Sequence, residues 1–253
     1  MTVAGADSAT VRVAQASKKD LRDAVVKARA AQAGWAGATP YLRGQILYRV
    51  AEMLDGRRDQ FAAEIEASGV DPDDAAAEVD AAVDTWVYWA GWSDKLVQVL
   101  GGVNPVAGPF LNLTTPEPVG VVGIVTPAAQ PLTGLSKLLA PVLCGGNTAV
   151  VLASAAAPLA PLTFGEVLAT SDVPAGVANL VCGSTDSLAQ VLADHDDIDA
   201  LEITGIEDPS RIEAVLEASA ANLKRVARTD GARTPATAGE FLELKTVWHP
   251  TRL

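Results

Sequence analysis

The fold of this 253-residue chain is decided by the stretch from Pro118 to Leu152, PVGVVGIVTPAAQPLTGLSKLLAPVLCGGNTAVVL. Two short apolar runs, 119–125 and 148–152, enclose a longer apolar segment, 132–143, that stops at Gly145 and Gly146. Strands that are buried on both faces read as continuous apolar runs, and parallel strands are joined by a crossover helix. The stretch therefore predicts a strand, a helix and a second strand that runs parallel to the first.

The same alternation continues to residue 227. Apolar runs that read as strands occupy 177–182, 200–203 and 223–227, and helical segments of about ten residues occupy 158–170, 185–193 and 209–220. Helices alternating with buried strands are typical of an α/β fold with a doubly wound, Rossmann-like parallel sheet. Many unrelated chemistries use such sheets, so the fold class alone gives no function.

The N-terminal third predicts three helices before any strand. Ser17 and Asp20 form a capping-box pattern, Thr39 precedes Pro40, and Asp71 precedes Pro72, each of which is a helix-start signal. Apolar residues at helical spacing carry the second helix through Ile65, and the third contains Trp86, Trp89 and Trp92. These tryptophans are expected to pack in the core.

The C-terminal residues 239–253 predict a β-strand that has no local partner. Leu242, Leu244, Thr246 and Trp248 alternate with Phe241, Glu243, Lys245 and Val247, so the two sets lie on opposite faces. A second exposed strand is expected at 110–115, within a turn-rich segment. A strand whose backbone groups find no partner often joins the sheet of another chain.

Composition excludes several classes of function. The chain is 49% hydrophobic and 20% charged, as in a globular protein, and its net charge of −12 without a Lys/Arg cluster argues against nucleic acid or an anionic membrane as a partner. Prolines and glycines divide the uncharged segment 138–164, so we expect no membrane span. Cys144 and Cys182 lie in apolar segments and no metal-ligand spacing occurs, so we expect core thiols and no metal. Residues 1–13 read as no signal peptide, which favours a cytoplasmic protein of bacterial type.

Several motifs together resemble the aldehyde dehydrogenase superfamily. They are EPVGVVGIVTP (117–127), KLLAPVLCGGNT (137–148), VPAGV (173–177), ITG (203–205), NLKRV (222–226) and the terminal EFLELKTVW (240–248), in the family's order. The resemblance covers nearly the whole chain and implies a nucleotide-binding domain. It also implies that the strand at 110–115 and the terminal strand form a small sheet that joins the catalytic-domain sheet of a neighbouring subunit.

The resemblance further implies an internal deletion. In the family a catalytic domain with the nucleophilic cysteine stands between the segments that match Val226 and the terminal strand, whereas here only a short Thr/Ala/Gly-rich stretch does. We expect helices in 1–100 packed on a Rossmann-like core at 118–228, a linker at 229–238, and a β oligomerisation arm made of 101–117 and 239–253. Neither Cys144 nor Cys182 stands where the nucleophile would.

Positions that match functional residues of the family also differ. The resemblance implies that Ala129 replaces the oxyanion-binding Asn, and that Thr229 replaces the general base. It likewise implies that Ala153 and Ala156 replace the Lys and Glu that hold the adenosine ribose, and that Ile206 and Ser210 belong to a changed pyrophosphate turn in which Glu207 and Asp208 would repel a dinucleotide. The expectation is a degraded NAD(P) site with no cofactor and no catalytic residue.

The leading hypothesis is a non-catalytic subunit that assembles with a full-length aldehyde dehydrogenase in a hetero-oligomer and stabilises or regulates it. Its expected partner-binding residues are Phe110, Leu111, Leu113, Phe241, Leu242, Leu244, Lys245, Val247 and Trp248. One alternative is a stand-alone protein that binds a small ligand on the degraded fold. Another is residual NAD(P)-linked aldehyde oxidoreductase activity that uses a partner's catalytic residues.

Overall fold

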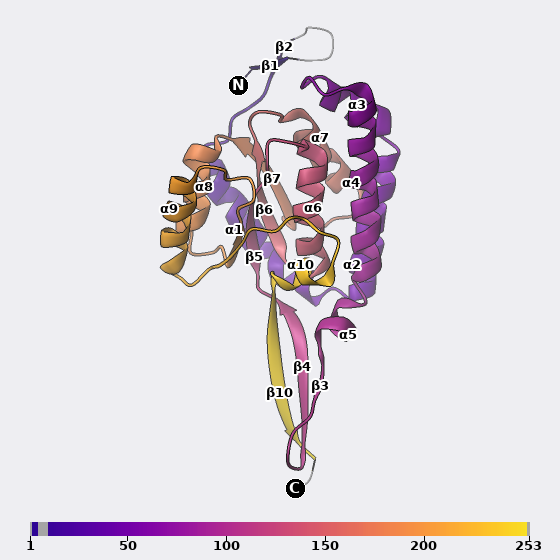
Figure 1. Ribbon diagram of the computed structural model, residues 1–253, viewed down its shortest axis with the longest axis vertical. Coiled ribbons are helices and arrows are strands. Elements are labelled where there is room, and N and C mark those ends of the chain that lie inside the picture. Colours follow the sequence, from indigo (N-terminus) through magenta and orange to yellow (C-terminus); the bar gives the residue numbers. More distant parts are fainter. Residues whose placement is uncertain (1, 5–9, 252–253) are drawn as a thin grey trace.

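A five-stranded parallel sheet forms the centre of the computed structural model, which describes residues 2–4 and 10–251 (Figure 1). Its strand order is β7-β6-β5-β8-β9. The strands are β5 (Val121–Val125), β6 (Thr148–Ser154), β7 (Ala178–Gly183), β8 (Ala200–Glu202) and β9 (Arg225–Ala227). The connecting helices are α6 (Pro131–Cys144), α7 (Leu159–Thr170), α8 (Thr185–Asp194) and α9 (Pro209–Ala220). The α/β, Rossmann-like fold predicted from the sequence is confirmed.

The side chains of alternate strand residues pack into two separate hydrophobic cores, one on each face of the sheet. Val122 and Ile124 of β5 face a core that is closed by α2, α4, α6 and α7. Val121 and Val125 of the same strand face a second core, closed by α1, α8 and α9. Because side chains alternate along a strand, a continuous apolar run supplies both cores at once.

Five helices precede the arm, with bounds that differ in part from the prediction. They are α1 (Lys18–Gly37), α2 (Pro40–Asp55), α3 (Arg58–Glu66), α4 (Pro72–Trp92) and α5 (Leu96–Leu100). The capping box is present, since Asp20 accepts from the Ser17 amide at 2.8 Å and Ser17 accepts from the Asp20 amide at 3.3 Å. The predicted second helix is divided at Gly56, and two short strands, β1 (Thr2–Ala4) and β2 (Thr10–Arg12), precede all helices; both predictions were wrong.

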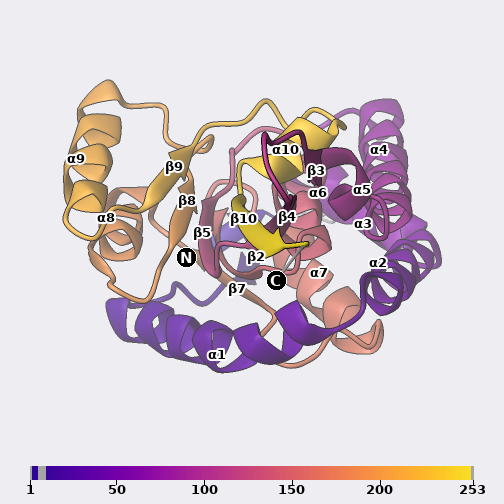
Figure 2. The ribbon, with the colours of Figure 1, turned by 90° about the horizontal axis from the view of Figure 1, so that it is seen from below.

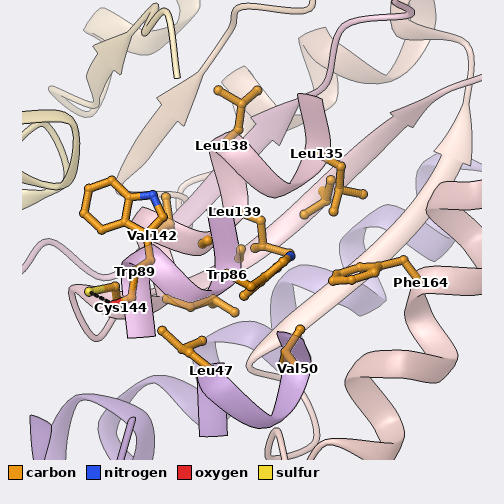
Figure 3. Packing of buried hydrophobic residues seen from close by; sticks show 14 of the residues in the cluster. Leu47, Val50, Trp86, Trp89, Leu135, Leu138, Leu139, Val142, Cys144 and Phe164 are labelled. Atoms are coloured by element: carbon orange, nitrogen blue, oxygen red, sulfur yellow. Dashed lines mark hydrogen bonds between the residues drawn. The ribbon is translucent and has the colours of Figure 1, made fainter. Parts of the chain in front are cut away.

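The larger core is built around two tryptophans of α4, as the sequence predicted. Trp86 stacks on Phe164 of α7 with ring centroids 5.4 Å apart (Figure 3). Its indole nitrogen donates a hydrogen bond to the Ser136 hydroxyl of α6 at 3.1 Å. Trp86 and Trp89 are fully buried, and Trp92 packs at the edge. These aromatic rings fix the helical layer against the sheet.

A three-stranded antiparallel arm projects from one end of the body (Figure 1). It consists of β3 (Gly102–Asn104), β4 (Phe110–Pro118) and β10 (Leu242–Pro250), with β4 in the centre. β10 pairs with β4 from Leu242↔Pro118 to Pro250↔Phe110. The partner of β10 is thus distant in the sequence, and the two strands form the small sheet that the resemblance implied. The other edge of β10 is free within the described residues.

The segment that leads from β9 to the arm is a packed element rather than the expected linker. It contains α10 (Pro235–Gly239), in which Thr237 and Ala238 are buried. Gly231 is buried against Lys137 of α6, and the Cζ atom of Arg233 lies 5.9 Å from the centroid of the Tyr88 ring. These contacts tie the short connection to the body of the protein.

None of the described helices combines the length and the apolar character needed to cross a membrane. Part of two predicted segments lies outside the described residues. These are residues 1 and 5–9 of the N-terminal segment, and residues 252 and 253 of the arm.

Candidate functional site

The candidate ligand crevice lies where the strand order reverses, at the carboxyl ends of β5 and β8. The chain proceeds from β5 to β6 on one side and returns to β8 on the other. In open parallel sheets, ligands bind outside the carboxyl ends of strands at this switch point. The two loops that line it are 126–130 and 203–208.

The loop after β8 crosses the end of β5 in close backbone contact. The Gly205 amide donates to the Val125 carbonyl at 2.9 Å, and a Cβ at Gly205 would lie 2.2 Å from the Thr126 carbonyl oxygen. Only glycine fits this crossing. The next side chain, Ile206, is buried in the core beside α9 and does not project from the turn.

The carboxylates expected to repel an anion at the start of α9 are partly engaged within the protein. Asp208 caps the helix, accepting from the Ser210 amide at 2.9 Å and from its hydroxyl at 2.8 Å. These hydrogen bonds lower the pKa of Asp208. Arg211 lies 3.4 Å from Asp208 and 3.0 Å from Asp186 of α8. Arg211 is thus shared between two acids, and Glu207 is exposed beside them, so the start of α9 keeps most of the negative charge that the sequence suggested.

The carboxylate of Glu202, which was not predicted as a site residue, is buried and links the segments that follow β8 and β9. Glu202, the last residue of β8, is fully buried, and burial raises the pKa of its carboxyl group. It accepts from the Thr204 amide at 2.8 Å and from the Thr229 amide at 3.1 Å. The signal was present as an acid inside the apolar run Leu201-Glu-Ile203, since an acid in a buried strand needs such donors.

The other positions that the resemblance singled out lie in different settings. Ala129 is exposed in the loop after β5, and Ala156 is exposed after β6. Ala153 is buried within β6, where it pairs with Cys182 of β7. Thr229 is half-buried and accepts the Thr204 hydroxyl at 2.8 Å. The effect of these residues on ligand affinity stays a prediction.

Neither cysteine is poised to act as a nucleophile. Cys144 is fully buried at the end of α6, and burial raises the pKa of its thiol to about 12. Cys182 is also buried, and its pKa is raised for the same reason. Because the thiolate is the reactive form, both behave as core thiols, as expected.

The arm presents two chemically different faces. Directly paired residues share a face, so Val103, Leu113 and Val247 form one aliphatic rung across β3, β4 and β10, with Leu111 beside it. The opposite face is polar in its middle, where Asn104, Asn112, Thr114 and Thr246 are joined by hydrogen bonds of 2.6 to 3.1 Å. At the tip of the arm, the rings of Phe110 and Trp248 contact each other edge to face, with their centroids 5.9 Å apart.

Most of the predicted partner-binding residues are exposed on this arm, and two are not. Phe110, Leu111, Leu113, Leu244, Val247 and Trp248 are each more than two-fifths exposed. Lys245 is exposed and donates to Glu117 at 2.5 Å, which raises the pKa of its amine. Phe241 and Leu242 are buried in the protein's own core, so their prediction as partner contacts was wrong.

Comparison with known proteins places this architecture in one family. The sequence profile described as "Aldehyde dehydrogenase family" matches residues 4–247. Cytosolic aldehyde dehydrogenase 1 of Elephantulus edwardii is 33% identical over 229 residues, which cover 88% of this chain and 45% of that relative. The chain thus spans about half the length of the curated relatives it matches.

Two solved structures carry the same fold at a similar level of identity. The NAD+ complex of an aldehyde dehydrogenase from Bacillus cereus is 28% identical, with a TM-score of 0.81 over 89% of this chain and 46% of that chain. PnpE in complex with nicotinamide adenine dinucleotide is 29% identical, with a TM-score of 0.81 over 89% of this chain and 47% of that one.

These complexes overturn the expectation that the protein takes no cofactor. The fold that this chain shares with them holds NAD there, so it points to a nicotinamide dinucleotide. At the switch point Ile206 is turned into the core and leaves the turn free of its bulk, whereas Glu207 and Asp208 keep two carboxylates at the start of α9.

The family profile covers nearly the whole chain, and the sheet, the helical layer and the β arm all follow that architecture. The protein belongs to the aldehyde dehydrogenase family.

Proposed function

We propose that this protein is a non-catalytic aldehyde dehydrogenase-like subunit that assembles, through its β arm, with a full-length aldehyde dehydrogenase and stabilises or regulates it. The observation that carries the proposal is the arm itself. It leaves the body as three strands, with β10 at one edge (Figure 1). That edge is free within the described residues, and Val103, Leu113 and Val247 form an exposed aliphatic rung on one face.

The connection between β9 and β10 supports a non-catalytic role. Ala227 ends β9 and Leu242 begins β10, and the residues between them form α10 and a packed connection. Such a short segment leaves no room for a second domain between them. Both cysteines are buried with a raised pKa, so the described chain offers no exposed thiol for attack on an aldehyde.

An edge strand with exposed apolar side chains favours a partner that supplies a strand or a sheet edge. Backbone groups on a free edge give affinity by strand addition, and alternate side chains give specificity. A full-length aldehyde dehydrogenase supplies a sheet that this chain lacks, which is why it is the proposed partner rather than a second copy of the arm.

The test is co-expression with the aldehyde dehydrogenase encoded nearest to this protein, followed by size-exclusion chromatography with mass determination. Deleting β10 would also remove Leu242 from the core, so the point variant Val247→Glu is the sharper probe. Val26→Glu, on exposed α1, is the matched control. We expect co-elution for the native chain and the control, and its loss for Val247→Glu.

Equal co-elution of all three proteins would contradict the role of the arm, and no co-elution of the native chain would contradict the assembly. The partner's turnover and melting temperature, measured with and without this subunit, then separate regulation from stabilisation. NAD+-linked aldehyde oxidation by the isolated chain would instead favour the enzymatic alternative.

A further inference from the structure

A groove of about 800 Å³ lies between α2 and α4, with Asp172 at its rim. The two helices stand together at one side of the molecule, opposite α8 and α9 (Figure 2). This side is separate from the arm, which leaves the body at another end (Figure 1). The groove plays no part in the crevice or in the proposed arm assembly.

Two exposed tyrosine side chains and two glycines lie on the same face of the molecule, in the lining of the groove. Tyr41 and Tyr48 of α2 are 68% and 51% exposed, although such large side chains are usually covered in globular proteins. The lining also contains two small residues, Gly44 of α2 and the exposed Gly91 of α4. A Cβ at Gly44 would lie 2.9 Å from the Ala90 carbonyl oxygen, whereas a Cβ at Gly91 would meet no atom within 4 Å. Gly91 therefore marks open space beside two exposed tyrosines.

The charges that line the groove are nearly balanced. Arg49 lies 3.3 Å from Asp172, and Lys95 lies 2.8 Å from Asp94. Glu52 is the remaining charged side chain of the lining. The protein as a whole has a net charge of −12, whereas the lining of the groove carries two basic and three acidic side chains, so charge repulsion between two copies is weak at this face.

We propose that the groove between α2 and α4 is a self-association surface on which a second copy of this chain docks about a two-fold axis. A two-fold contact requires that one face hold both the projecting group and its receptor, and this face does: a tyrosine of one copy can enter the hollow at Gly91 of the other. Arg49 and Lys95 of one copy can approach Glu52 of the other across the axis.

The expected dimer is a modest one. Fifteen residues line the groove, against the roughly 20–30 residues a side of a standard interface. Such a contact dissociates on dilution, so its mass must be followed over a concentration series.

The test uses the full chain in size-exclusion chromatography with light scattering. Gly91→Phe fills the hollow without an internal clash, and Gly34→Phe places the same ring on the exposed face of α1, where a Cβ also meets no atom within 4 Å. We expect the native chain and Gly34→Phe to approach twice the 26.1 kDa of the monomer at high concentration, and Gly91→Phe to stay near 26.1 kDa. A native chain that is monomeric throughout the series, or a Gly91→Phe variant that dimerises like the native chain, would overturn the proposal.

A second pair of variants separates this surface from the arm. Tyr48→Glu is expected to abolish self-association, and Val247→Glu on the arm is expected to leave it intact. The reverse result would place self-association on the arm and overturn the groove proposal. Because Gly91→Phe leaves the arm unchanged, it should still co-elute with the full-length aldehyde dehydrogenase, so either inference can fail while the other holds.

Discussion

Glu78, in the middle of α4, accepts a hydrogen bond from the backbone amide of Leu132 at 2.8 Å, in the first turn of α6. The Thr133 amide donates to the same carboxylate oxygen at 3.1 Å, and the Thr133 hydroxyl donates to the Glu78 carbonyl at 2.7 Å. Gln130, the residue before α6, provides no side-chain cap and has a φ of 54°. The start of α6, beside the crevice, is therefore capped from another helix.

Replacing Glu78 with Ala should lower the free energy of unfolding by about 2 kcal/mol, because two buried amides lose their acceptor. Urea unfolding followed by circular dichroism measures the change. Asp84→Ala, at an exposed position of the same helix, is the control and should change stability by less than about 0.5 kcal/mol. Equal losses in the two variants would mean that Glu78 does not act as the cap.

Glu202 should make stability fall as pH rises above the acidic range. Burial raises its pKa in the folded state above the ordinary value of 4.5, so the folded protein holds this proton more tightly than the unfolded chain does. The resulting stability is present below the unfolded pKa and is lost as pH rises through the folded pKa. Glu78, whose pKa is also raised by burial, acts in the same direction.

The variant Glu202→Gln tests this sign, because it cannot ionise. Its free energy of unfolding, measured from about pH 5 to about pH 8, should decline less with pH than that of the native protein. Its overall stability is expected to change as well, since the Thr229 amide loses a carboxylate acceptor. The slope is the readout, and parallel pH profiles for the two proteins would contradict the prediction.

Local sequence signals predicted most of the elements, and contacts between distant segments account for the errors. Ser17 and Asp20 mark the start of α1 because both halves of the capping box lie within one turn. The break at Gly56 was missed because the apolar spacing continues across it to Phe61. Likewise, nothing near Phe241 indicates that its carbonyl accepts from Asn147 at 3.0 Å, so its burial could not be read from the strand pattern.

The candidate site divides in the same way. The apolar runs predict the strands on either side of Gly205, whereas the switch point follows from the strand order, which only the structure gives. The direction of the Ile206 side chain does not follow from the apolar runs, because it depends on a tight turn in which the Ile206 amide donates to the Ile203 carbonyl at 2.9 Å. The burial of Ile206 could therefore not be read from the motif.

Both thiols should resist modification in the folded protein. With a pKa of about 12 for Cys144 and a raised pKa for Cys182, almost no thiolate is present near neutral pH, and neither sulfur is accessible. Titration with a chromogenic disulfide should detect no fast-reacting thiol in the native chain and both cysteines in guanidinium chloride. A fast-reacting native thiol would contradict this and strengthen the enzymatic alternative.

Gly231 should be the least replaceable residue of the packed connection. Its φ is +67°, and a Cβ there would lie 2.8 Å from the Cβ of Lys137. Gly231→Ala is therefore expected to cost about 1–2 kcal/mol. Gly165→Ala, inside α7 with no atom within 4 Å of the added Cβ, should instead stabilise the protein by about 0.5–1 kcal/mol. Thermal unfolding distinguishes the opposite signs, and a neutral Gly231→Ala would mean that the connection is not fixed to α6.

Leu242 and Val247 should separate folding from assembly, although they lie on the same strand. Leu242 is 5% exposed and its side chain packs beside Gly145, whereas Val247 is 54% exposed on the aliphatic face of the arm. Leu242→Glu buries a charge in the core and should cost about 3 kcal/mol or more in unfolding free energy. Val247→Glu should change stability by less than about 0.5 kcal/mol but abolish co-elution with the full-length aldehyde dehydrogenase. Melting curves and chromatography on the same samples give both readouts. If Val247→Glu lowered stability as much as Leu242→Glu, the tip of the arm would be part of the folding core, and its apolar side chains would no longer argue for a partner.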